Sequence, residues 1–317
     1  MTQPNLSELG ALVPLNDGSK LQLERVILRI IQTTLQSHST EISENEALRK
    51  IKSDFAKREF TEIFESASHD HLWIYFKYYV ASRALGYTSL FMSHPDWFKG
   101  VKRVVGLGAG AGSECLAFRL FQHMQRVQGC KRSSEMEEED GFYLTMHDMA
   151  DWMPVLSGLN SSMDDILGKT TATVSFEQTN LLQLFEDTPE SQSRLQSFTH
   201  QLGSADMVTS MFLLNELLTV DKRGTVQLIT TLVQNMRPGS LLLAVESAGS
   251  FSHVHVKGTT YMAFTLLDHI QAFETVYGCD SQWYRYPQAL KSYANGLPLD
   301  NMRYCVRVFR KKKNQGE

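Results

Sequence analysis

The chain has 317 residues, of which 42% are hydrophobic and 21% are charged, a composition that excludes a disordered chain or a fibre. Its 31 lysines and arginines and 35 aspartates and glutamates give a net charge of −4, so any surface that binds nucleic acid must be local. The length allows one large domain or a main domain with a smaller companion.

The cysteines and the hydropathy pattern bear on the compartment. The four cysteines lie far apart and form no Cys-x-x-Cys pair, which argues against a zinc ribbon or a redox dithiol and indicates reduced, intracellular thiols. Residues 1–18 lack the features of a signal peptide, and no apolar run approaches the length of a membrane span. We therefore expect a soluble intracellular protein with no membrane partner.

Helical patterns fill the first part of the chain. Apolar residues recur at three- and four-residue spacing over Leu21–Leu35, which predicts a first helix. A second helix is expected from Ser43, where Glu46 completes a capping-box pattern, and a third, aromatic helix over about Asp70–Leu85. We expect the aromatic side chains to pack onto the next domain. The prediction is an N-terminal helical region at residues 1–99 and a main domain at residues 100–317.

After Lys102 short apolar strands alternate with helical segments. The predicted strands are Arg103–Leu107, Phe142–Met146, Ala172–Phe176, Met207–Met211, Leu241–Val245 and a late strand, Tyr304–Arg310, whose alternation also fits an antiparallel strand. Alternation of strand and helix predicts parallel βαβ units, hence an α/β fold with a doubly wound, mostly parallel sheet. The polar, acidic segment Gln128–Gly141 is expected to be an exposed loop rather than a metal site.

A glycine-rich segment, Val104–Glu114, follows the first predicted strand. Glycines at Gly106, Gly108 and Gly110 allow a sharp turn and a close approach of a ligand, and the helix that follows offers free backbone N–H groups. The sequence therefore predicts a cofactor loop, for which NAD and S-adenosylmethionine are the main candidates.

Both cofactors need an acid after the second strand to hold the ribose hydroxyls. Asp148 occupies that place, with a helix N-cap as the alternative role, and Asp151 could substitute for it.

The glycine spacing resembles the first motif of class I methyltransferases more than the dehydrogenase motif. Later segments resemble the family's motifs in the same order: residues 176–182, where Gln178 and Asn180 would contact adenine; residues 212–217, where Asn215 faces the methyl donor; and residues 237–240 before the fifth strand. The resemblance implies S-adenosylmethionine as cofactor and a Rossmann-like, seven-stranded sheet. Gly106 replaces the family's acid at the end of the first strand, so Glu114 is a candidate for organising the methionine end of the cofactor.

The outer segments resemble a narrower group. Tyr79–Tyr87, His147–Trp152, Trp283–Pro287 and Asn301–Tyr304 are similar to segments of the fungal large-subunit (25S) ribosomal RNA uridine N(3)-methyltransferase family, over roughly residues 70–312. The resemblance implies methyl transfer to N(3) of a ribosomal uridine in the nucleolus, with ribosomal RNA or a pre-ribosome as partner. It also suggests Arg83 and Tyr87 as substrate-binding residues.

A uridine nitrogen can accept a methyl group only after a base takes its proton. Glu216, with the adjacent Asn215, is the first candidate for the catalytic role, and His147 is the second; a cofactor or helix-cap role for Glu216 is the alternative. The histidine pairs at 69/71 and 253/255 show no third ligand, so we expect no metal.

Two segments favour RNA as substrate. Trp283 beside Arg285 is suited to stack on an unpaired base, and the end of the chain concentrates basic charge at Arg303, Arg307, Arg310 and Lys311–Lys313. The alternatives are a small-molecule methyltransferase of the same fold and a non-catalytic ribosome-assembly factor. We expect a monomer in the nucleus, or alternatively in the cytoplasm.

Overall fold

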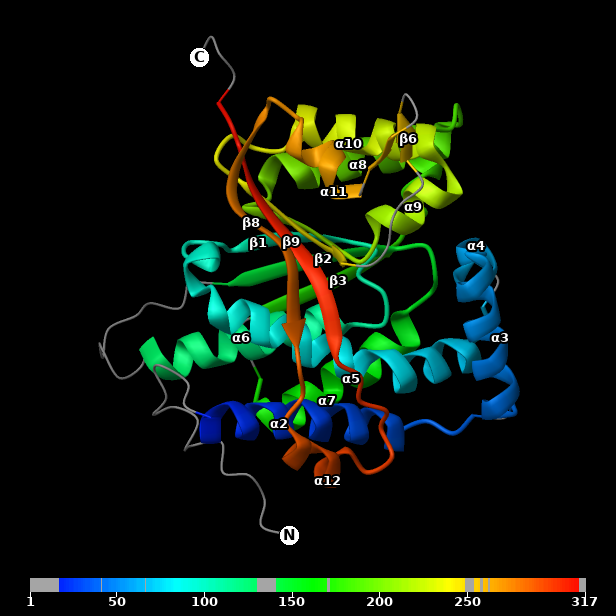
Figure 1. The fold of residues 1–317 in the computed structure, drawn as a ribbon, viewed down its shortest axis with the longest axis vertical. Helices are drawn as coiled ribbons and strands as arrows, with labels where there is room; N and C mark the ends of the chain where they lie inside the picture. The colour runs from blue at the N-terminus through cyan, green and yellow to red at the C-terminus, as the bar shows by residue number, and fades with distance from the viewer. Residues whose placement is uncertain are drawn as a thin grey trace.

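A seven-stranded sheet forms the centre of the computed structural model, which describes residues 17–40, 42–65, 67–129, 141–169, 172–248, 254–256, 259–261 and 263–313 (Figure 1). The strand order is β3-β2-β1-β4-β5-β9-β8. Strands β1 to β5 are parallel, and β9 is antiparallel to both of its neighbours, β5 and β8. The predicted α/β class with a mostly parallel, seven-stranded sheet is confirmed.

The strand bounds agree closely with the apolar runs of the sequence. They are β1 Arg103–Leu107, β2 Phe142–Asp148, β3 Ala172–Gln178, β4 Met207–Met211, β5 Leu241–Ser247, β8 Phe273–Tyr284 and β9 Met302–Lys311. A separate two-stranded sheet pairs β6 Val254–Val256 with β7 Thr259–Tyr261. The sequence analysis missed β8, because this edge strand is largely exposed and two register shifts interrupt its alternation.

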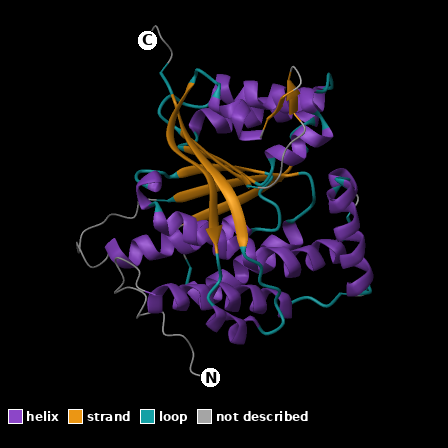
Figure 2. Cartoon of the chain, viewed as in Figure 1, coloured by secondary structure: helices purple, strands orange, loops and turns teal. Residues whose placement is uncertain are grey.

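Helices cover both faces of the sheet (Figure 2). One face is covered by α5 His69–Ser93, α6 Ser113–Gly129 and α7 Met153–Leu167, and α2 Asp17–Gln36 packs against α5 and α7 from outside. The other packs against α8 Pro189–Ser204, α9 Leu214–Val220, α10 Lys222–Asn235 and α11 Ala263–Asp268. The remaining short elements are α3 Glu44–Lys57, α4 Phe60–Phe64, α12 Lys291–Ala294 and the single turns η1 Pro95–Phe98, η2 Gln183–Phe185 and η3 Gln288–Leu290.

Two hydrophobic cores lie on the two faces because successive strand residues point in opposite directions. Val104 belongs to the core under α5 and α6, whereas its neighbour Val105 belongs to the core under α8 and α10. The N-terminal helices α2 and α5 contribute to the first core together with the sheet. The division of the chain at residue 99 therefore separates segments that share one core, and it stays a prediction.

The N-terminal helices differ from expectation in detail. Ser43 stands at the N-cap of α3, but its side chain makes no capping hydrogen bond, so that half of the capping box is not formed. Helix α5 extends to Ser93, and its buried aromatic residues pack onto the main domain, with the Tyr75 ring centroid 5.5 Å from that of Trp152. In the predicted loop at 128–141, residues 130–140 lie outside the described residues. No helix in the described part of the chain is long and apolar enough to cross a membrane.

Candidate active site

The glycine segment forms a turn between β1 and α6, and its glycines serve different purposes. Gly108 and Gly110 both have left-handed backbones, with φ of +59° and +56°. A Cβ at Gly108 would lie 2.5 Å from Leu213 Cδ1, so a side chain there would have to displace the Leu213 side chain. A Cβ at Gly110 would meet nothing closer than 3.8 Å, so Gly110 borders open space. A ligand can therefore approach the backbone at Gly110.

Asp148 lies at the end of β2 and faces the glycine turn. Its Oδ2 accepts a hydrogen bond from Gly110 N at 2.9 Å and its Oδ1 accepts one from Ala150 N at 3.0 Å. Burial raises the pKa of Asp148. The N-cap of α7 is Trp152, which excludes the helix-cap role for Asp148, while Asp151 Oδ1 accepts from Met153 N at 3.2 Å in the first turn of that helix. Of the two acids, Asp148 is the one beside the turn.

The two residues expected at the adenine end lie one strand further along the same edge. Gln178 pairs with Asp148 across β2 and β3, and its Nε2 donates to Met149 O at 3.1 Å. Asn180 follows β3, and its Oδ1 accepts from Leu182 N at 3.1 Å. Gln178 therefore lies beside Asp148, and both side chains are engaged by backbone groups.

Glu114 lies under the turn, in the first turn of α6. Its side chain is buried, Oε1 accepts a hydrogen bond from Thr209 Oγ1 on β4, and Oε2 is buried without a hydrogen-bond partner. Burial raises the pKa of Glu114 to about 7. Gly106, at the end of β1, lies directly beside this carboxyl group.

A buried acid that the sequence analysis missed, Glu246, holds the loop after β4. Its Oε1 accepts from Leu214 N at 2.7 Å and its Oε2 accepts from Asn215 Nδ2 at 2.8 Å. Burial raises the pKa of Glu246 to about 7. Asn215 Oδ1 is buried and has no hydrogen-bond partner. The signal that could have found Glu246 is an acid directly after the buried strand run that ends at Val245.

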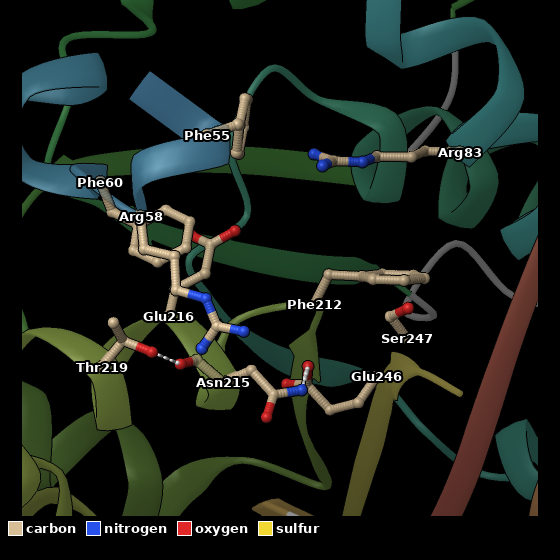
Figure 3. A pocket seen from close by; sticks show the side chains of 10 residues that line it. All are labelled: Phe55, Arg58, Phe60, Arg83, Phe212, Asn215, Glu216, Thr219, Glu246 and Ser247. Atoms are coloured by element: carbon tan, nitrogen blue, oxygen red, sulfur yellow. Dashed lines mark hydrogen bonds between the residues drawn. The ribbon is translucent and has the colours of Figure 1, made fainter. Parts of the chain in front are cut away.

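A cavity of about 310 Å³ opens at this edge of the sheet (Figure 3). Its wall combines the N-terminal helices with the carboxyl ends of β4 and β5: Phe55, Arg58, Phe60, Arg83, Phe212, Asn215, Glu216, Thr219, Glu246 and Ser247. Burial raises the pKa of Glu216 to about 8; Arg83 opposes this rise, whereas Glu246 and Asp148 add to it. Leu213, which follows Phe212 of the wall, lies against Gly108, so the cavity adjoins the glycine turn.

Arg83 reaches the cavity from α5. Its Nη1 donates to the Tyr75 hydroxyl at 2.5 Å, and its guanidinium lies 5.9 Å from the ring centroid of Phe212. The Tyr87 ring stacks on Phe212 with a centroid distance of 6.2 Å, and Tyr87 is buried, so it supports Phe212 from behind. The structure thus brings Arg83 into the cavity and places Tyr87 beneath its wall.

Phe212 is a second residue that the sequence analysis missed. It has φ of +63°, a conformation that costs a bulky L-residue about 1–2 kcal/mol, and its N–H donates to Val245 O at 2.7 Å. This strained turn aims the ring at Arg83 and leads directly into α9 with Asn215 and Glu216.

The predicted stacking residues lie together on the last two strands. Trp283 is 51% exposed, and the guanidinium groups of Arg285 and Arg303 lie 5.2 Å and 6.0 Å from its ring centroid. Trp283 pairs with Arg303 across β8 and β9, and the next residue of β9, Tyr304, pairs with Ser247 of the cavity wall. This surface, Trp283–Arg285–Arg303, therefore lies at the same edge as the cavity.

Arg307, predicted as a substrate-binding residue, is engaged by two carboxylates within the protein. Its Nε donates to Asp268 Oδ1 at 3.0 Å and its Nη2 to Asp280 Oδ1 at 2.5 Å, and the residue is only 8% exposed. Two carboxylates thus already neutralise its charge. Arg310 pairs with Leu241, at the start of β5, so the basic end of the chain lies at the opposite edge of the sheet from the cavity.

His147 is not among the residues that line the cavity. It is buried, its Nε2 lies 2.7 Å from Gln201 Oε1 on α8, and its ring packs edge-on against Phe198. These contacts make it a core residue rather than a base. Among the described residues, no group of three His, Cys, Asp or Glu could hold a metal ion; His253 lies outside them.

The family described as "Putative SAM-dependent methyltransferase" matches residues 31–310, and the chain belongs to this family. A relative from Saccharomyces cerevisiae, named 25S rRNA (uridine(2843)-N(3))-methyltransferase, is 26% identical over 94% of this chain and 88% of its own length.

Two solved structures are similar to the chain at low sequence identity. The N-methyltransferase NodS from Bradyrhizobium japonicum, in complex with S-adenosyl-L-homocysteine, is 14% identical, with a TM-score of 0.40 over 78% of this chain and 95% of that chain. A SAM-dependent methyltransferase from Methanosarcina mazei is 13% identical, with a TM-score of 0.40 over 69% and 97%. The fold assignment of this chain follows from its own strand order.

S-adenosylmethionine is the cofactor of this family, and the residues present fit it. The open space above Gly110 leaves room for a ligand against the backbone, and Asp148 stands beside that space. The orphaned Oε2 of Glu114 is a buried acceptor under the same turn, suited to a ligand that carries positive charge. The sequence predicted Gly110, Asp148 and Glu114 as cofactor residues, and the structure gathers them around one turn.

Proposed function

We propose that this methyltransferase modifies N(3) of a uridine in large-subunit ribosomal RNA. The observation that carries the proposal is Glu216, a half-buried carboxyl group with a pKa raised to about 8, in a cavity that adjoins the cofactor turn. The name of the yeast relative supplies the finer identity of the acceptor. Nucleolar residence, a pre-ribosomal partner and a monomeric state are part of the same proposal.

The chemistry sets the demands on the cavity. S-adenosylmethionine supplies a methyl group on an activated sulfonium, so the protein's task is to align the acceptor and exclude water. The acceptor is a weakly acidic imide N–H that must lose its proton. A base works best when its pKa lies near the operating pH, as that of Glu216 does.

Asn215 supports the orientation of the acceptor. Glu246 holds its Nδ2, which leaves the partnerless Oδ1 as a fixed hydrogen-bond acceptor in the cavity wall. Arg83 provides a cation on the opposite helix, suited to a carbonyl oxygen that gains negative charge when the imide loses its proton.

The Trp283–Arg285–Arg303 surface is suited to hold RNA beside the cavity. An exposed indole between two guanidinium groups offers both a stacking plane and positive charge, which is how proteins hold unpaired bases. Its location at the cavity edge allows a neighbouring nucleotide to stack there while the target base enters the cavity.

Incubation of the protein with S-adenosylmethionine and large-subunit rRNA fragments, followed by nucleoside analysis, tests the proposal. We expect 3-methyluridine, formed about 10²–10⁴-fold more slowly by Glu216→Gln because a general base contributes that much. The affinity for the cofactor should be retained. Glu62→Gln, which removes an exposed acid from α4, is the matched control and should keep the wild-type rate. Wild-type turnover by Glu216→Gln would remove Glu216 from the chemistry.

A small-molecule acceptor is the second candidate. The net charge of −4 and the cavity of about 310 Å³, which suits a single small ligand, favour it. Cofactor binding without any methylated nucleoside in treated RNA would support this candidate and reject the ribosomal one.

A further inference from the structure

Glu114 is a buried acid, and one of its carboxyl oxygens lacks a hydrogen-bond partner. It is 1% exposed, Thr209 Oγ1 donates to its Oε1, and its Oε2 has no hydrogen-bond partner. Leaving a buried carboxylate oxygen unpaired is costly, so this oxygen calls for a partner that the folded chain does not supply. A cationic group is the partner that stabilises the ionised form.

The carboxyl group of Glu114 fills the place beside the end of β1. A Cβ built on Gly106 would lie 3.4 Å from Glu114 Oε1 and 3.5 Å from Thr209 Oγ1. A longer side chain at position 106 would therefore overlap the carboxyl group of Glu114. An acid that comes from α6 thus occupies the space that a side chain from β1 would otherwise use.

The strand order indicates which end of the cofactor reaches Glu114. Strand β1 lies between β2, which carries Asp148, and β4, which carries Thr209. A cofactor whose ribose lies at Asp148 and which crosses the open space at Gly110 directs its other end toward β4. In S-adenosylmethionine that end carries an ammonium and a carboxylate, and only the ammonium complements an acid.

We propose that Glu114 binds the ammonium group of the methionine moiety of S-adenosylmethionine, in place of an acid on the first strand. The contact is a charge-assisted hydrogen bond to Oε2, while Oε1 keeps its bond to Thr209. The raised pKa of Glu114 fits a group that lacks this cation when the cofactor is absent. The inference depends on the cofactor and not on the methyl acceptor, so it stands even if ribosomal RNA is not the substrate.

Calorimetric titration of Glu114→Gln with three ligands tests the assignment. Glutamine keeps the shape and the bond to Thr209 but removes the charge. We expect S-adenosylmethionine and S-adenosylhomocysteine to bind about 10- to 100-fold more weakly, as loss of a charged hydrogen bond implies. 5′-Methylthioadenosine, which lacks the amino-acid end, should bind as it does to the wild-type protein. Glu24→Gln is the matched control: Glu24 is a buried acid on α2 that accepts from the Tyr284 hydroxyl, also has a partnerless Oε2 and does not line the cavity, so its substitution should not discriminate among the ligands.

Moving the carboxyl group from position 114 to position 106 provides a second test. Glu114→Ala should lose the preference for S-adenosylhomocysteine over 5′-methylthioadenosine, and Gly106→Asp combined with Glu114→Ala should restore much of it. Equal weakening of all three ligands by Glu114→Gln would show a merely structural role. Weaker binding of S-adenosylmethionine alone would indicate that Glu114 contacts the sulfonium. Either result, or unchanged binding, overturns the proposal.

Discussion

Gly108 and Gly110 have the same backbone conformation but different surroundings. A side chain at Gly108 would collide with Leu213, whereas a side chain at Gly110 would enter open space. Substitution of Gly108 therefore tests packing as much as binding, and only Gly110 isolates the approach of the cofactor. The sequence motif treats the two positions alike, because it records backbone freedom and not the neighbours that each glycine meets.

Gly110→Ala should abolish or strongly weaken binding of S-adenosylmethionine while the protein remains folded. The left-handed backbone adds a strain of about 1–2 kcal/mol. Gly100→Ala is the matched control, because Gly100 has φ of +77° and nothing within 4 Å of an added Cβ. Thermal melts should show similar destabilisation of both variants, and cofactor titration should separate them. Equal cofactor affinity in the two variants would refute the placement at Gly110.

At the scale of elements, the direction of β9 decides which basic residues can meet RNA. The ten-residue strand starts at the cavity edge with Met302 and Arg303 and ends at the opposite edge with Lys311. At about 3.3 Å per residue, the two ends lie roughly 30 Å apart. Figure 1 shows the end of β9, in red, on the far side of the sheet from α3 and α4. Charge that is adjacent in sequence is thus divided between two edges.

Substitutions on β8 and β9 should therefore have unequal effects on RNA affinity. Trp283→Ala should weaken RNA binding about 5- to 150-fold, since stacking of one base contributes about 1–3 kcal/mol. Arg303→Gln should reduce the slope of log affinity against log salt by about 0.7. Lys312→Gln, an exposed charge at the other end of β9, is the control and should change neither quantity. Fluorescence titrations at several salt concentrations measure both, and the reverse ranking would return the RNA site to the chain end.

Across the whole molecule, buried acids at one sheet edge make stability depend on pH. The pKa values of Glu114 and Glu246 are raised to about 7 and that of Glu216 to about 8, each chiefly by burial. Each acid is protonated in the folded state where the unfolded chain is already ionised. Folding thus takes up protons, and the stability present below the unfolded pKa is lost as the pH rises through the folded pKa.

The cofactor-free protein should consequently lose stability as the pH rises from about 4.5, the unfolded pKa of these acids, to about 8, and the trend should level off above that. In the acidic part of that window, up to about pH 6.5, the buried His147, whose pKa is lowered by burial, acts in the opposite direction. Thermal unfolding at fixed ionic strength measures the trend, and Glu114→Gln should flatten it by removing one of the titrating acids. A melting temperature that rises over this window would contradict the burial of these acids in the folded protein.

Local patterns in the sequence determined the strands and the cofactor turn. Buried parallel strands require short apolar runs, and the conformational freedom of glycine is a property of single residues. Short stretches of the sequence were therefore enough to predict β1 to β5 and the turn before α6. Asp148 was predictable for the same reason, because an acid that follows the second strand must lie at the carboxyl edge. The exposed and irregular β8 carried no such local pattern.

Only the tertiary structure decided which distant residues meet. Arg307 is neutralised by Asp268 and Asp280, which lie 39 and 27 positions away, so its charge could not be judged from the basic chain end. Arg83 faces Phe212 because α5 packs across the strand ends, a contact between residues far apart in the chain. The pKa of an ionisable group and the availability of its charge depend on its surroundings. Those surroundings come from segments that are far apart in the sequence, so the spacing of residues does not reveal them.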